Sequence, residues 1–387
     1  MATPRYVAGN SITLLKNGAD FFPALEAAID AAQTEVHLET YIFADDSAGQ
    51  RIAAALRRAA QRNVVVRIVI DGFGSRDLFP PEMADELLKS GVEVFIYRSE
   101  AFRFSLRRYR LRRMHRKIAM IDGHTAFVGG INIIDDVNTP HHTPPRYDYA
   151  VKLSGPLLQE VRPVVHRLWL MLSWTRVRTR MRGMFPSVPP APPRGALLAA
   201  LVIRDNLRHR DDIEEAYLDA IENAQHEIIV ANAYFFPGLR FRRALVNAAA
   251  RGVKVRLLLQ GKVEYRWLHH ATRALYGSLL AGGVEIIEYH KSFMHAKVAV
   301  IDDDWATVGS SNIDPFSFML SREANVIVRD ANFCAQLRHS LLAAILDGAV
   351  PVELSEWKQR PFLERFEAWL AYGSARFILG TLGYPQK

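Results

Sequence analysis

A histidine–lysine–aspartate pattern occurs twice in this chain, and its side chains could bind and transfer a phosphate group. The pattern is His-x-Lys-x4-Asp, and its two copies are His115, Lys117 and Asp122, and His295, Lys297 and Asp302. Imidazole titrates near neutral pH, so a histidine can serve as a nucleophile or as an acid and base. Lysine adds a compact positive charge. A single copy of so short a pattern could be a chance match or a surface histidine.

The residues that follow each motif keep the same register. Gly129 and Asn132 lie 14 and 17 residues after His115, and Gly309 and Asn312 lie 14 and 17 residues after His295. A duplicated domain that had kept only its core would not need a histidine, a lysine and an asparagine at matching places. The shared spacing therefore indicates a duplicated functional site.

Strand geometry explains the spacing. Residues 117–121 and 297–301 alternate as strands do, and residues i and i+2 of a strand share a face, so His and Lys point together. A turn and a returning strand then bring Asn132 or Asn312 beside them. Asparagine offers neutral hydrogen-bond donors, so each copy can converge on one small anion. Ser310 is a further candidate phosphate donor, although the first half has Gly130 at that place.

Each histidine needs a carboxylate to orient it. The motif aspartates are the obvious choice, but each lies five residues past its lysine at a strand end, so we expect them to be mostly structural. Better candidates lie on the next strand of each half, namely Asp148 and Glu323. We expect Glu323 to orient His295. The competing interpretation is an ordinary ion pair with a neighbouring arginine.

The order of elements is also repeated. In the first half, the patterns predict helices at 22–32, 49–61 and 82–90 and strands at 36–43, 64–70 and 92–97. In the second half they predict helices at 211–223 and 241–251 and strands at 228–236, 253–258 and 284–289, with Asp211 or Asp212 as N-cap. Alternating strands and helices predict an α/β fold with a mostly parallel sheet that is covered on both faces.

Domain boundaries follow from the repeat. Residues 185–195 contain five prolines and read as a linker. We therefore expect one domain at 1–184, the linker at 185–195, a second domain at 196–350 and an amphipathic C-terminal segment at 351–387. The single Cys334 excludes an internal disulfide framework. No secretory signal is visible, and no apolar run approaches the ~18 residues of a transmembrane helix.

The charge balance favours an anionic partner, because Lys and Arg together number 49 against 41 Asp and Glu. The excess is concentrated just before the first motif, in Arg98, Arg103, Arg107, Arg108, Arg110, Arg112, Arg113, Arg116 and Lys117. A second basic cluster spans residues 176–182. A run of charge is usually a solvated face. Here it leads directly into the catalytic motif, which favours a functional interpretation.

The double motif resembles the phospholipase D superfamily. The stretches 113–117, 232–238 and 305–312 resemble bacterial cardiolipin synthases of the B type, and the resemblance covers about residues 8–347. It implies two tandem α-β-α sandwich domains about a pseudo-two-fold axis, with both motifs in one site. It further implies that His115 is the nucleophile and His295 the acid and base, that Lys117, Lys297, Asn132 and Asn312 stabilise developing charge, and that no metal or other cofactor is needed. Sequence symmetry alone leaves the order of the histidines open.

The activity implied by the resemblance is transfer of a phosphatidyl group between two phosphatidylglycerol molecules. Alternatives are phospholipid hydrolysis, a nucleic-acid phosphodiesterase, which the net charge would suit, and a non-catalytic scaffold. Too few aromatic residues are interleaved with the basic run to favour nucleic acid, and intact motifs argue against a scaffold. We expect anionic phospholipids and the cytoplasmic face of the bacterial inner membrane as partners, contacted through the arginine run and an apolar helical face within 361–380.

Overall fold

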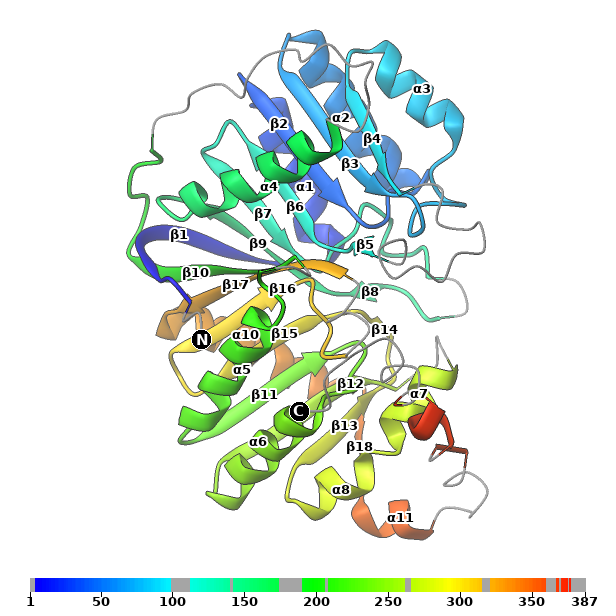
Figure 1. Cartoon of the computed structure of the whole chain (residues 1–387), viewed down its shortest axis with the longest axis vertical. Helices are drawn as coiled ribbons and strands as arrows, with labels where there is room; N and C mark the ends of the chain where they lie inside the picture. The colour runs from blue at the N-terminus through cyan, green and yellow to red at the C-terminus, as the bar shows by residue number, and fades with distance from the viewer. Residues whose placement is uncertain are drawn as a thin grey trace.

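The fold consists of two similar halves joined through one continuous sheet (Figure 1). The computed structural model describes residues 4–98, 112–139, 142–173, 190–205, 208–261, 266–314, 321–359, 367–368, 370–374 and 376. The elements of the first half are β1(Val7–Lys16), α1(Asn17–Asp30), β2(Glu35–Thr40), α2(Ser47–Gln61), β3(Val65–Asp71), α3(Pro81–Lys89), β4(Glu93–Tyr97), β5(Arg113–Met114), β6(Lys117–Ile121), β7(Thr125–Gly129), β8(Arg146–Tyr147), β9(Tyr149–Ser154) and α4(Leu158–Ser173).

The second half repeats this order with small additions. Its elements are β10(Leu197–Arg204), α5(Asp212–Asn223), β11(Glu227–Asn232), α6(Leu239–Ala250), β12(Lys254–Gln260), α7(Arg266–Arg273), α8(Tyr276–Ala281), β13(Glu285–Tyr289), β14(Phe293–Met294), β15(Lys297–Ile301), β16(Trp305–Gly309), β17(Ser321–Arg329), α10(Ala331–Leu346), β18(Ala349–Pro351) and α11(Leu354–Gln359). The expected strands and helices of both halves are confirmed within a few residues. Asp211 is the N-cap of α5, but its side chain makes no capping hydrogen bond.

The sheet is mixed, so the expectation of a mostly parallel sheet is wrong. Its main path is β18-β13-β12-β11-β15-β16-β17-β10-β1-β9-β7-β6-β2-β3-β4. Parallel pairing is confined along this path to β2-β3-β4 and β11-β12-β13, which are the strands connected by helices. The strands nearer the centre are antiparallel because short turns connect β6 to β7 and β15 to β16.

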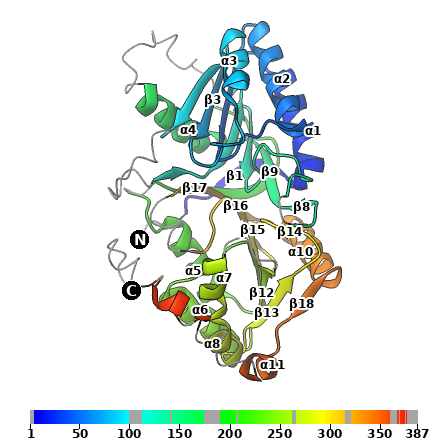
Figure 2. The same ribbon diagram turned by 90° about the vertical axis from the view of Figure 1, so that its right-hand side faces the viewer.

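Helices cover both faces of the sheet in each half. Figure 2 shows α1 and α2 on one side of the first-half strands with α4 on the other, and α10 opposite α5 and α6 in the second half. Strand β3 is buried from Val66 onward because it is covered on both faces. Helix α2 presents Ile52, Leu56 and Ala59 to the core, at the spacing of one helical face.

The two halves meet at the centre of the sheet, where β1 and β10 pair antiparallel. Residues 185–189 of the expected linker lie outside the described residues, as do 361–366, 369 and 377–387 of the C-terminal segment. In the parts of the chain that the structure describes, no helix has both the length and the apolar character needed to cross a membrane.

Candidate active site

Two very short strands carry the motif histidines across the boundary between the halves. Strand β5, which precedes His115, pairs in parallel with β17 of the second half, and β14, which precedes His295, pairs in parallel with β8 of the first half. The backbone N–H of His115 donates to the Arg322 carbonyl at 3.1 Å, and that of His295 donates to the Tyr147 carbonyl at 2.8 Å. Each histidine is thus positioned by the half to which it does not belong.

The carboxylate that orients each histidine also comes from the other half of the chain. Nδ1 of His115 lies 2.9 Å from Oε1 of Glu323, and Nδ1 of His295 lies 2.7 Å from Oδ2 of Asp148. Sequence reasoning found both carboxylates but paired Glu323 with His295, which is wrong. The crossing follows from the strand pairs, because Arg322 and Tyr147 immediately precede the two acids. With Nδ1–H donated to the acid, Nε2 of each ring is left to act on a substrate.

Burial and neighbouring charges shift the pKa values of Glu323 and Asp148 in opposite directions. Burial alone would raise the pKa of Glu323, but the positive charge of His115 and its hydrogen bond lower that pKa below the ordinary value. Burial raises the pKa of Asp148 to about 6, although the Lys297 ammonium opposes the shift. Glu323 is therefore ionised at neutral pH, whereas burial disfavours the charged forms of both Asp148 and His295.

The two motif lysines lie beside the histidines. The Lys117 ammonium donates to the His115 carbonyl at 2.6 Å, and Lys297 donates to the His295 carbonyl and lies 2.9 Å from Nδ1 of that ring. Burial, opposed by the charge of Glu323 and assisted by that of Lys297, lowers the pKa of Lys117 to about 7. Burial, together with the lysine charges, also lowers the pKa of both histidines. This mutual effect places both motifs in one electrostatic site.

The asparagines complete the site. Asn132 and Asn312 are buried, and each lies three residues after the strand that returns from the motif turn, β7 or β16. Oδ1 of Asn132 accepts a hydrogen bond from the Ile42 backbone at 3.1 Å, so its amide hydrogens remain for another acceptor. Oδ1 of Asn312 has no hydrogen-bond partner among the described residues.

Ser310 does not occupy the role expected of it. Its hydroxyl donates to Oε2 of Glu323 at 2.5 Å and accepts from the Ala324 backbone at 3.1 Å. The Ser310 hydroxyl therefore binds Glu323, the carboxylate that orients His115, and is not directed at a phosphate. At the equivalent place in the first half, a Cβ on Gly130 would lie 2.3 Å from Oδ1 of Asp148. Glycine is needed there because the Asp148 carboxylate occupies that space.

The motif aspartates are structural, as expected. Asp122 and Asp302 adopt positive φ values of 52° and 47° in the turns after β6 and β15. The Asp122 carboxylate accepts backbone hydrogen bonds from Gln33, Thr34 and Glu35 at 2.8–2.9 Å. Asp302 accepts the equivalent set at 2.8–3.0 Å. Both carboxylates bind the start of the neighbouring strand, at the end of the motif strand away from the histidine.

Replacing Asp302 with alanine should destabilise the protein rather than remove its chemistry. Three backbone N–H groups would lose their acceptor; the Glu227 group is partly buried, and a buried donor without an acceptor costs about 1–3 kcal/mol. We expect the melting temperature of Asp302→Ala to fall while turnover, measured well below that temperature, changes less than about tenfold. A larger loss of turnover at unchanged melting temperature would contradict the structural role.

Sequence reasoning missed several side chains that shape the site. The Tyr41 ring lies edge-on to the His115 ring at 4.7 Å, and the Lys117 ammonium lies 5.4 Å from its centre. The matching bridges Phe43–Ile133 and Phe235–Ile313 make Ala233 the counterpart of Tyr41, so the second half lacks this ring. Tyr41 could have been found from the sequence as an aromatic residue directly after the buried strand β2, which pairs with the motif strand β6.

A second missed pair fixes the approach to each histidine. The Asp71 carboxylate accepts from the Met114 backbone at 2.8 Å, and the Gln260 side chain accepts from the Met294 backbone at 3.1 Å. Asp71 is the last residue of β3, and Gln260 is the last residue of β12. A polar residue at the carboxyl end of an apolar parallel strand is typical of a functional site at that edge of the sheet. They position the peptide directly before each histidine.

Arg116 connects the first motif to helix α4. Its guanidinium donates to both oxygens of the buried Glu39 carboxylate and to the Val164 carbonyl of α4 at 3.1 Å. The residue at the same place in the second motif is Ala296, which is buried among apolar side chains. The first motif strand is therefore attached by a buried ion pair and the second by apolar packing.

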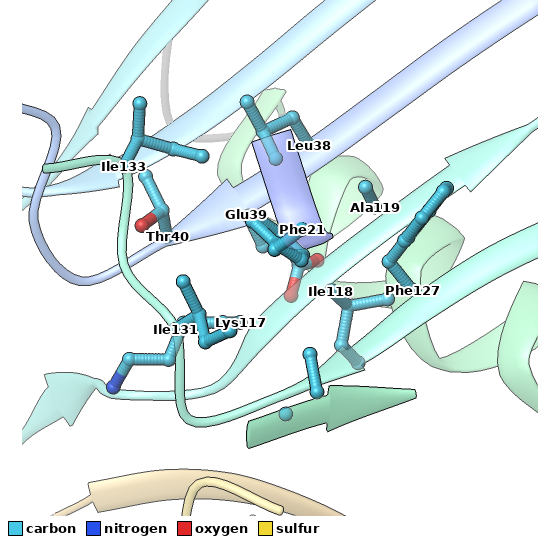
Figure 3. A pocket seen from close by; sticks show the side chains of 12 residues that line it. Phe21, Leu38, Glu39, Thr40, Lys117, Ile118, Ala119, Phe127, Ile131 and Ile133 are labelled. Carbon is cyan, nitrogen blue, oxygen red and sulfur yellow. The ribbon is translucent and has the colours of Figure 1, made fainter. Parts of the chain in front are cut away.

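A small cavity lies beneath the first motif but does not extend the site. It has a volume of about 10 Å³ and is lined mainly by apolar side chains such as Phe21, Leu38 and Phe127 (Figure 3). That is about the space of one water molecule. Figure 3 shows the Lys117 amine pointing away from this apolar cluster. A substrate must therefore meet Lys117 from another side.

Comparisons with known proteins agree with this geometry. A family model described as "Cardiolipin synthase, PLD-like domain" matches residues 25–142 and 217–344. The chain is 39% identical to cardiolipin synthase B of Shigella flexneri and to that of Escherichia coli K12, in each case over 376 residues, 97% of this chain and 90% of the relative. The crystal structure of phosphatidylserine synthase from Haemophilus influenzae Rd KW20 shares the fold, with a TM-score of 0.73 and 14% identity over 97% of this chain and 96% of that one.

Proposed function

Because the chain belongs to the cardiolipin synthases, enzymes with phospholipase D-like domains, we propose that it transfers a phosphatidyl group from one phosphatidylglycerol to a hydroxyl group of another. The products are cardiolipin and glycerol. One observation supports this chemistry most directly: the two histidines, His115 and His295, both feel the charges of Lys117 and Lys297, and each has its own carboxylate. A phosphodiester exchange needs a nucleophile, a proton carrier and positive charge, and this arrangement contains all three.

In the first step, Nε2 of His115 attacks the phosphorus atom of the donor lipid. An N–P bond forms as the P–O bond to the glycerol head group breaks, and the departing oxygen takes a proton from His295. Glu323 supports His115 as the nucleophile because an ionised carboxylate stabilises the positive charge that develops on the imidazole. The Ser310 hydroxyl adds a second hydrogen bond to that carboxylate.

In the second step, the hydroxyl group of the acceptor lipid attacks the phosphohistidine. His295 takes the proton of this hydroxyl, the new P–O bond forms, and the N–P bond to His115 breaks. His295 must therefore gain and lose a proton in each cycle. Its partner Asp148, whose pKa is raised to about 6 by burial, lies 2.7 Å from Nδ1 and stabilises the positive charge when the ring takes up the proton.

The lysines and asparagines bind the phosphate oxygens in both steps. Burial and the charges of Lys297 and Lys117 together lower the pKa of His295 below its ordinary value. A bound phosphodiester would place one negative charge beside these lysines and offset that effect. Substrate binding then favours the protonated His295 that the first step requires.

Product analysis with two substrates tests the proposed function. Purified protein is incubated with phosphatidylglycerol vesicles and, separately, with single-stranded DNA, and products are identified by mass spectrometry. We expect cardiolipin and glycerol in equal amounts from the lipid and no cleavage of the DNA. Phosphatidic acid without cardiolipin would indicate a hydrolase, and DNA fragments would indicate a nuclease; either result would overturn the proposal.

Transfer should not depend on a divalent metal. Lys117 and Lys297 supply the positive charge that a magnesium ion provides in other phosphoryl transfer sites. We expect activity to change less than about twofold after dialysis against EDTA. Loss of activity that one added divalent metal restores would contradict this mechanism.

A lipid substrate also requires contact with a bilayer, and the protein's place is the cytoplasmic face of the bacterial inner membrane. The arginine run from Arg98 to Arg116 supports this, because each cation near an anionic leaflet contributes about 1 kcal/mol. Residues 99–111 of that run lie outside the described residues, as does most of the apolar face expected within 361–380. Of that face, Leu370 is described and is 56% exposed.

A further inference from the structure

Three large apolar side chains are exposed near the His115 side of the site. Phe73 follows strand β3 and is 43% exposed, while Leu170 and Met171 lie near the end of helix α4 with exposures of 38% and 43%. Residues of this size and type are usually buried, and a group of them at the edge of a functional site indicates a contact surface.

Two arginines connect these side chains to the catalytic strands. The Arg113 guanidinium lies 4.8 Å from the centre of the Phe73 ring, and the Arg322 guanidinium lies 3.9 Å from the sulfur of Met171. Arg113 belongs to β5 and Arg322 to β17, and these two strands pair with each other. The apolar and cationic groups therefore lie on both sides of the crossing that positions His115 and Glu323. We call Phe73, Leu170, Met171, Arg113 and Arg322 the rim patch.

The corresponding place beside His295 has a different character. The counterpart of Arg113 is Phe293, which is only 4% exposed and stacks on His142 with ring centres 4.5 Å apart. Arg146 lies over the same ring at 4.9 Å. On this side, Arg146 also donates to the Asn138 carbonyl at 2.7 Å, next to Val137, which is 68% exposed. Among the described residues, the group of three exposed large apolar side chains with two arginines borders His115, whereas the His295 side has the single exposed Val137.

From this placement we infer that the rim patch is the surface through which the protein docks on an anionic phospholipid bilayer. The inference rests on the proposed function and names its membrane-contacting face. Apolar side chains that enter the interface, beside arginines that meet lipid phosphates, are the combination that holds proteins on anionic membranes. In sequence, the patch adjoins residues 99–111 and 174–182, which lie outside the described residues and contain several arginines and one acidic residue, Glu100.

Docking at this face also fits the chemistry. Two members of the patch adjoin the site in sequence: Arg113 stands two residues before His115, and Arg322 stands one residue before Glu323, which orients His115. A lipid whose head group enters beside the rim patch can place its phosphate near His115 while its acyl chains stay in the bilayer. The donor lipid would therefore enter from the His115 side.

The first test removes the apolar part of the patch. The variant carries Phe73→Ser, Leu170→Ser and Met171→Ser, and its matched control carries Leu346→Ser and Val350→Ser, which replace residues that are 88% and 55% exposed on α10 and β18. Binding is measured by co-sedimentation with vesicles of phosphatidylglycerol and phosphatidylcholine. We expect the patch variant to bind at least about tenfold more weakly and the control to bind like the unchanged protein. Equal binding by both variants would overturn the inference.

A substrate that needs no surface separates docking from catalysis. With short-chain phosphatidylglycerol dissolved as monomers, the patch variant should turn over within about twofold of the unchanged protein. If it loses this activity too, the patch belongs to the active site and the docking role is wrong. If the unchanged protein forms no cardiolipin from any phosphatidylglycerol, the proposed function fails, while vesicle binding still tests the patch.

A labelling experiment reports insertion directly and does not depend on the triple variant folding. The native Cys334 is buried, and burial raises its thiol pKa to about 11, so it should not react with a thiol dye. A polarity-sensitive dye is attached to Met171→Cys or, as the control, to Leu346→Cys. Phosphatidylglycerol vesicles should shift the emission of the Met171→Cys label to the blue and leave the Leu346→Cys label unchanged. The reverse pattern, or no shift at Met171→Cys, would contradict docking at the rim patch.

Discussion

His295→Ala should stop turnover and accumulate a phosphatidyl group on His115. Without His295, no group activates the acceptor hydroxyl, so the second step fails while the His115–Glu323 pair remains intact. Loss of one member of such a catalytic unit typically costs about 10⁴- to 10⁶-fold in rate. The departing glycerol also needs a proton from His295. The experiment therefore uses a phosphatidyl nitrophenyl ester, whose leaving group departs without protonation.

The expected observation is a burst of one nitrophenol per protein molecule, followed by almost no turnover. Mass spectrometry of the acid-quenched protein should locate the adduct on His115. His115→Ala should show neither burst nor adduct. His124→Ala replaces an exposed histidine in the turn after β6 and serves as the control, with unchanged turnover expected. An adduct on His295 in the His115→Ala protein would reverse the two assigned roles.

Glu323→Gln should slow the burst by about 10²–10⁴-fold, because it acts on His115. Glutamine has nearly the same shape but carries no negative charge, so it cannot stabilise the positive charge that forms on the imidazole. Asp148→Asn makes the same change to the partner of His295. It should leave the burst nearly unchanged and slow the steady state, which depends on proton removal from the acceptor.

This comparison tests the crossed arrangement itself. If each acid served the histidine of its own half, Asp148→Asn would slow the burst and Glu323→Gln would slow only the steady state. Asp302→Asn is the matched control, since it also converts a carboxylate to an amide in the second half but lies in the turn after β15. A burst that Asp302→Asn slows as much as Glu323→Gln does would show that loss of charge alone explains the effect.

The sequence contained enough information to predict the elements and the chemical groups of the site. The paired apolar strands, the two motifs and the acids Asp148 and Glu323 could be identified because each follows from local pattern and spacing. Strand direction was harder to predict. The turn and returning strand expected after each motif imply the antiparallel pair that residues 117–121 and 125–129 form. The antiparallel strands at the centre of the sheet, such as β1 and β10, were not predicted, because the sheet was expected to be mostly parallel.

Contacts between the halves could not be read from spacing. Glu323 lies 28 residues after His295 and 208 after His115, so proximity in sequence favoured the wrong partner. The outcome depends on two-residue strands, β5 and β14, that are too short to give a pattern. The role of Ser310 was also misjudged. Its hydroxyl donates a hydrogen bond to Glu323, and spacing along the sequence did not indicate that contact.

The exchange of β5 and β14 between the halves has a consequence for the ancestry of this fold. A single ancestral unit would have had a histidine without its acid and an acid without its histidine, so it could have worked only as a symmetric dimer with its centre on the two-fold axis. Gene fusion then freed the two copies to diverge. Tyr41 opposite Ala233 and Gly130 opposite Ser310 are places where they did so. Complementation between two full-length chains, one carrying His115→Ala and the other His295→Ala, should fail, because in a fused chain both histidines of a centre come from the same molecule.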